Sequence, residues 1–137
     1  MKRLSVIIVV CVLTLLSAAA SQAQPPDLTG SWRGTGTQIQ PNGDLATFHY
    51  TLVVNNQYGR LVSGYLIRFD PAHPGIGGHT ALFSMTGYTS GKTLSLNLGN
   101  IAIDGRVLTP PDASQALRLH GHSTEDTSTF AVTLNQD

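Results

Sequence analysis

Apolar and polar positions alternate along most of the chain in short runs. These runs are rich in β-branched, aromatic and leucine side chains, and they end in clusters of Gly, Asn, Asp, Pro or Ser. Such a pattern is typical of antiparallel strands joined by tight turns, and no helical periodicity follows the N-terminal segment. The pattern predicts strands at residues 31–39, 45–54, 60–69, 79–88, 92–98, 100–108, 115–122 and 128–135.

Each predicted strand has two faces, because successive side chains of a strand point to opposite sides. One face of every strand carries an apolar stripe, which we expect to face the interior. In the third strand we expect this face to hold Leu61, Ser63, Tyr65, Ile67 and Phe69. The expected interior residues of the other strands are Phe48, Tyr50, Leu52, Val54, Ala81, Phe83, Met85, Leu94, Leu96, Leu98, Ile101, Ile103, Leu117, Leu119, Phe130, Val132 and Leu134.

Strands that follow one another through short turns and bury a single apolar face favour an up-and-down sheet. Closure into a barrel buries that face and removes exposed edges. We therefore predict an all-β fold, an eight-stranded antiparallel up-and-down β-barrel. A two-sheet β-sandwich built from the same strands is the alternative.

The N-terminal segment has the features of a secretory signal peptide. Lys2 and Arg3 precede an apolar run at 6–16 and a small-residue tract that ends at Ala23. The apolar run is short for a bilayer core of about 30 Å, so we expect cleavage and no retained membrane anchor. The sequence thus predicts a signal peptide at 1–23, a single domain at 24–137, and a secreted protein in the periplasm or the extracellular space.

Charge and cysteine content narrow the possible partners. Basic and acidic residues are equal in number, 8 of each, and form no like-charge block. We therefore expect no nucleic-acid partner, because recognition of nucleic acid needs a concentrated basic surface. The single cysteine, Cys11, falls within the predicted signal peptide. The mature domain would then be stabilised by packing and strand pairing rather than by disulfides.

The first predicted strand opens with Leu28-Thr29-Gly30-Ser31-Trp32, which resembles the Gly-x-Trp opening of the calycin barrels, the group that includes lipocalins and avidins. The resemblance implies a barrel over residues 28–135 in which the tryptophan closes one end. It does not extend to biotin binding. Gly34 and Gln38 stand where avidins have an Asn and a Ser that bond biotin, and Trp32 is the only tryptophan.

Motifs for catalysis or metal binding are weak. His120 and His122 share one side of a strand, but we expect that side to face outward, so we predict no metal site and no cofactor. A Pro- and Gly-rich connection at 70–78 carries a histidine but no dinucleotide-binding pattern, and it suits either a lid or an ordinary loop. No nucleophile motif appears, so we favour a binding protein over an enzyme without excluding activity.

The interior face carries polar groups among apolar ones, and this combination is typical of a ligand pocket. We therefore predict that the barrel binds a small apolar or amphipathic molecule inside. The alternative is a packed, ligand-free barrel that acts as a protein-interaction or inhibitor module, with an envelope protein as partner. The candidate ligand-binding residues are Trp32, Phe48, Tyr50, Ser63, Tyr65, Ile67, Phe83, Met85 and Phe130.

Overall fold

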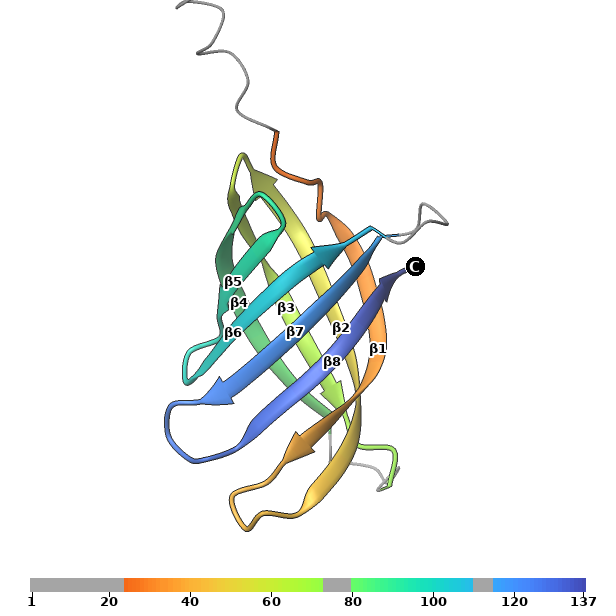
Figure 1. The fold of residues 1–137 in the computed structure, drawn as a ribbon, viewed down its shortest axis with the longest axis vertical. Helices are drawn as coiled ribbons and strands as arrows, with labels where there is room; N and C mark the ends of the chain where they lie inside the picture. The colour runs from red at the N-terminus through yellow and green to blue at the C-terminus, as the bar shows by residue number, and fades with distance from the viewer. Residues whose placement is uncertain (1–23, 73–79, 110–114) are drawn as a thin grey trace, which may run out of the picture.

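The computed structural model describes residues 24–72, 80–109 and 115–137, and the regular structure within these ranges is all β-strand. The predicted signal peptide at 1–23 lies outside the described residues, as does most of the predicted lid or loop at 70–78. The strands, shown in Figure 1, are β1 (Gly30–Ile39), β2 (Leu45–Tyr58), β3 (Leu61–Phe69), β4 (Thr80–Ser90), β5 (Thr93–Asn97), β6 (Ile101–Leu108), β7 (Ala116–Ser123) and β8 (Thr129–Gln136).

Every strand pairs antiparallel with the next one in the sequence, and β1 also pairs with β8. The strands therefore form one closed barrel in the order β1 to β8 (Figure 1). This confirms the predicted all-β, eight-stranded, up-and-down barrel, and the two-sheet sandwich is not the fold. The closed ladder is consistent with the calycin-like architecture that the Gly-x-Trp opening implies.

A β-bulge in β2 determines which side of β3 faces inward. The register shifts between Val54 and Asn56, so that β2 gains one residue relative to β3. The strand then continues beyond its predicted end at Val54 as far as Tyr58, which pairs with Leu61. Because one inserted residue exchanges the two faces of everything beyond it, Val62 faces inward and Leu61 outward.

The inner face predicted for β3 is therefore wrong. Leu66 pairs with Leu52 and both are fully buried, which identifies their shared side as the interior. Ser63, Tyr65 and Ile67 lie on the outer face. At the two ends of the same face, Leu61 and Phe69 are exposed.

The expected apolar stripes of the other strands do face inward, and they form one continuous core. Trp32 is fully buried near the end of the barrel where β1 begins, and its Nε1 donates a hydrogen bond of 2.9 Å to the carbonyl of Leu28. The buried core consists of Leu28, Trp32, Phe48, Tyr50, Leu52, Val54, Val62, Leu66, Met85, Leu94, Leu96, Leu98, Ile103, Val107, Leu117, Leu119, Val132 and Leu134.

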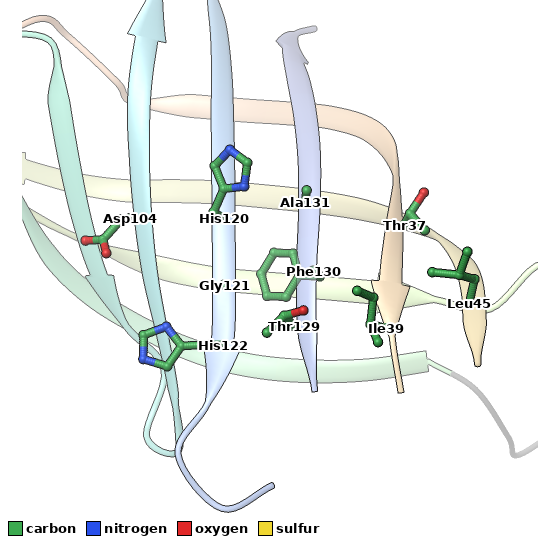
Figure 2. Close-up of a pocket in the computed structure, with 10 residues that line it drawn as sticks. All are labelled: Thr37, Ile39, Leu45, Asp104, His120, Gly121, His122, Thr129, Phe130 and Ala131. Atoms are coloured by element: carbon green, nitrogen blue, oxygen red, sulfur yellow. The ribbon is translucent and has the colours of Figure 1, made fainter. Parts of the chain in front are cut away.

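Glycine at position 121 makes room for an aromatic ring inside the barrel. Gly121 on β7 pairs with Phe130 on β8. A Cβ at Gly121 would come within 2.0 Å of Phe130 Cε1, so the ring lies directly over the glycine (Figure 2). The same ring stacks on Tyr50, with centroids 5.1 Å apart and planes 18° from parallel. These rings fill the barrel between β2 and β8.

Candidate functional site

A small cavity opens at the end of the barrel where β1 and β3 finish and where β2, β4, β6 and β8 begin. We call it the mouth cavity. Its volume is about 30 Å³, room for one or two water molecules. The residues that line it are Gln38, Tyr50, Leu66, Arg68, Phe83, Ile101, Ser123, Ser128, Thr129 and Phe130.

Arg68 is the distinctive residue of this cavity. It follows Leu66 on β3 by two positions and therefore shares its inward face, directly opposite Tyr50 on β2. Its Nη1 donates a hydrogen bond of 2.9 Å to Gln38 Oε1 on β1. Its Cζ lies 4.8 Å from the ring centroid of Phe48 and 5.9 Å from that of Phe83. The guanidinium is thus held by cation–π contacts and by a neutral amide.

Arg68 forms no ion pair with an acidic side chain of the described residues. The ion pair found within residues 24–72, 80–109 and 115–137 joins Arg33 to Asp137 on the surface. The strands β2 to β5 contain no Asp, Glu or Lys, and Arg68 is their only arginine. A partly buried cation surrounded by neutral groups is costly unless something compensates it.

Two polar atoms at the mouth cavity are buried without a hydrogen-bond partner among the described protein atoms. They are the phenol oxygen of Tyr50 and Nε of Arg68. Tyr50 is 2% exposed, and burial raises its pKa from 10.0 to about 12 although the charge of Arg68 lowers it. The phenol therefore stays protonated at physiological pH and can donate a hydrogen bond. Buried polar groups of this kind indicate a functional site or an ordered water.

The mouth cavity brings together only part of the predicted ligand site. Tyr50, Phe83 and Phe130 line it, and Phe48 packs against Arg68 beside it. Two further candidates, Trp32 and Met85, are core residues that do not line it, and three lie on the outer surface of the barrel: Ser63, Tyr65 and Ile67.

Sequence reasoning missed Arg68 and Gln38. A charged residue in a strand is ordinarily assigned to the solvent face, and this assumption also favoured the wrong side of β3. One signal was present in the sequence: Arg68 is the only charged residue in strands β2 to β5. A single charge in such a neutral region is unusual and could have drawn attention to the position.

The histidines of β7 lie on the outside, as predicted. His120, His122 and Asp104 line an open groove of about 430 Å³ on the outer surface of β6 to β8 and β1 (Figure 2). Their side chains do not converge, and the described residues contain no group of three or more His, Cys, Asp or Glu that could hold a metal ion.

The outer surface of β2 to β5 is uncharged and partly apolar. Leu61 pairs with Tyr88, and Ile67 pairs with Leu82. Leu61, Leu82 and Tyr88 are 64%, 68% and 54% exposed, respectively. Depletion of charge together with exposed aromatic and aliphatic side chains is typical of the centre of a protein–protein interface.

Within the described residues, we find no helix of the length and apolar character needed to cross a lipid bilayer.

Comparison with known proteins identifies no family. No family model matches the chain, and no curated protein matches it. A crystal structure of a protein of unknown function from Bacteroides ovatus is similar in fold over 80% of this chain, with 10% sequence identity and a TM-score of 0.47. The match covers 41% of that protein, so this chain spans less than half of its length.

Proposed function

We propose that this protein binds a small amphipathic ligand at the open end of its barrel. The observation that carries the proposal is the pair of buried, unpartnered polar atoms, Tyr50 Oη and Arg68 Nε, beside the mouth cavity. A ligand that supplies an acceptor there would recover the hydrogen bonds that folding removes from these groups. Apolar walls from Leu66, Phe83 and Phe130 would contact the rest of the molecule.

The packed core limits how far such a ligand could enter. Phe130 and Tyr50 stack across the barrel below the mouth, and the mouth cavity is only about 30 Å³. A drug-sized ligand needs roughly 300 Å³ or more. The proposal is therefore a site for the polar head of a ligand, or for a very small molecule, rather than a deep pocket of the lipocalin kind.

The location of the protein outside the cytoplasm is part of the same proposal. The sequence features of residues 1–23 support export to the periplasm or the extracellular space. A closed barrel without cysteine would not depend on whether that compartment is oxidising or reducing. A calycin relationship is supported by the barrel closure and by the Gly-x-Trp opening at Gly30 and Trp32.

Native mass spectrometry after incubation with a lipid and metabolite extract tests the proposal. We expect the protein to retain one or a few small molecules. A matched pair of variants locates them: Ile101→Trp fills the mouth cavity from β6, whereas Ala102→Trp adds the same side chain to the outer face one residue later.

Retention should be lost in Ile101→Trp and kept in Ala102→Trp. Equal retention by both variants would place the ligand elsewhere. If the wild-type protein retains nothing from extracts of several sources, the ligand-binding proposal is wrong.

A second candidate function, an interaction module, is favoured by the uncharged outer surface of β2 to β5. Pull-down from an envelope fraction should then recover a partner protein, and Leu82→Lys should abolish its recovery. Thr133→Lys, on the outer surface of β8, is the matched control and should leave recovery unchanged. Recovery that is insensitive to Leu82→Lys would argue against this surface.

A further inference from the structure

The geometry points to a carboxylate as the group that the mouth cavity recognises, so that the ligand is a small monocarboxylic acid bound as its anion. This inference rests on the proposed function and names the chemistry of the same site. It follows from the charge of Arg68, from the number and direction of the free donors around it, and from the size of the space.

The first step concerns charge. Arg68 carries one positive charge that no acidic side chain of the described structure offsets within ion-pair distance. An arginine side chain carries its positive charge throughout the physiological pH range. A ligand with one negative charge makes the occupied site neutral, whereas a neutral ligand leaves the charge uncompensated and a dianion leaves an excess negative charge.

The second step concerns donors. Nη1 of Arg68 is engaged by Gln38, so the guanidinium edge formed by Nε and Nη2 is not used by that bond. This edge presents two parallel N–H groups, the geometry that binds both oxygens of a carboxylate. Tyr50 Oη supplies a further donor without a partner. The amide nitrogen of Gln38 is also a donor, since its oxygen accepts from Arg68. An ionised carboxylate accepts at about four lone-pair positions, so one carboxylate can satisfy these donors together.

The third step concerns size and surroundings. A volume of about 30 Å³, room for one or two water molecules, is comparable to the oxygens of a carboxylate and is too small for a sugar or a phosphate ester. The residues around the opening that could contact the first carbons of a tail are Ile101, Phe83 and Phe130. An aliphatic or aromatic carboxylic acid with its tail at the rim fits this combination.

Two acidic residues near the cavity, Asp126 and Glu125, do not pair with Arg68. Asp126 accepts hydrogen bonds from Ser128 of its own turn, and Glu125 accepts one of 3.0 Å from Asn100. Both carboxylates are exposed on the β7–β8 turn. Neither forms an ion pair with Arg68.

NMR titration of the protein with a homologous set of probes tests the inference. The probes are acetate, butyrate, hexanoate and benzoate, each compared with the alcohol or amide of the same skeleton. The reporter is the Nε–Hε resonance of Arg68, which responds to a bound carboxylate directly. Affinities are measured for wild type, Arg68→Gln, Arg68→Lys and Tyr50→Phe, with Arg118→Gln as the control on the outer surface of β7.

We expect at least one carboxylate to shift the Arg68 resonance in a saturable manner and to bind at least tenfold more tightly than its neutral analogue. Arg68→Gln should weaken binding by about 10- to 100-fold, the usual effect of losing a charge-assisted hydrogen bond. Arg68→Lys should recover only part of the affinity, because lysine lacks the planar edge. Tyr50→Phe should have a smaller effect, and Arg118→Gln none.

The other outcomes overturn the inference in distinguishable ways. If neutral analogues bind as tightly as carboxylates, the ligand-binding proposal stands and carboxylate recognition is wrong. If inorganic phosphate binds more tightly than every carboxylate, the site is an anion site of a different class. If none of the probes shifts Arg68, carboxylate recognition is rejected, and the extract experiment above decides separately on ligand binding. Should Arg68→Gln fail to fold, Tyr50→Phe and the wild-type resonance still decide the question.

Discussion

Tyr50 and Arg68 lie directly opposite each other on β2 and β3, and both side chains leave the sheet on its inner face. This pair combines a phenol that is almost completely buried with a guanidinium that has no acidic partner among the described residues. Neither Tyr50 Oη nor Arg68 Nε has a protein hydrogen-bond partner there. The mouth of the barrel therefore holds two buried donors that the described protein atoms leave without a partner.

The protein should lose stability in strongly alkaline solution because of Tyr50. Burial raises the pKa of this phenol from 10.0 to about 12 in the folded state. Well below pH 10 the phenol is protonated in both states and stability is unaffected. As the pH rises from 10 to 12, the unfolded chain releases the proton first, so the free energy of unfolding falls. Urea unfolding at several pH values measures this decline.

Tyr50→Phe should reduce the alkaline decline, whereas Tyr88→Phe, at an exposed position on β4, serves as the matched substitution. An identical decline in wild type and Tyr50→Phe would show that the buried phenol does not cause it.

Gly121→Ala should destabilise the barrel by about 1–3 kcal/mol, the usual cost of overpacking a core. The added Cβ would meet Phe130 Cε1 at 2.0 Å, so the ring must move and lose its stacking on Tyr50. The combination with Phe130→Leu should be less destabilising than the sum of the single changes, because the smaller side chain leaves room. Chemical denaturation of the four proteins gives the coupling energy, and additive effects would contradict the contact.

The corrected faces of β3 can be tested with two adjacent lysines. Leu66 is 1% exposed, so Leu66→Lys should destabilise the protein by about 3 kcal/mol or more, or prevent folding. Ile67 lies on the outer face, and Ile67→Lys should cost about 1 kcal/mol or less. Thermal and chemical unfolding measure both changes. The opposite order would restore the face that the sequence pattern predicts.

Arg68→Met should leave the ligand-free protein as stable as wild type or more stable, by about 1 kcal/mol. Replacement of a partly buried, poorly compensated charge by an apolar side chain of similar length commonly has this effect. Arg118→Met, at an exposed position on β7, should change stability by less than about 0.5 kcal/mol. A marked loss of stability in Arg68→Met would mean that the contacts with Gln38, Phe48 and Phe83 outweigh the cost of burial.

The sequence predicts the barrel well because alternation, turn residues and closure agree with one another. Leu94, Leu96 and Leu98, for example, can be assigned to the interior from their spacing alone. The sequence fails at β3, where both faces carry apolar side chains and where the bulge between Val54 and Asn56 decides the outcome. A bulge depends on pairing with a neighbouring strand, so a single strand's pattern does not reveal it.

The candidate site was predicted only in part for the same reason. Tyr50, Phe83 and Phe130 belong to strands whose inward face the pattern identifies correctly. The pattern does not place Arg68 on the inward face, because that face of β3 depends on the bulge in β2. A charged side chain is also ordinarily expected in solvent. Gln38 can be recognised only from the folded barrel, because its Oε1 on β1 accepts a hydrogen bond from Arg68 on β3.

The closing pair of strands also has a consequence for the order of folding. β1 and β8 come from opposite ends of the described chain, so their pairing is the most distant in sequence and the slowest kind of contact to form. Until it forms, the charge-poor strands β2 to β5 belong to an open sheet with free edges, which invites association between chains. We therefore expect the yield of refolded protein to fall as the protein concentration rises. Substitutions that slow the pairing of β8 with β1 should lower this yield more than substitutions of residues that line the mouth cavity.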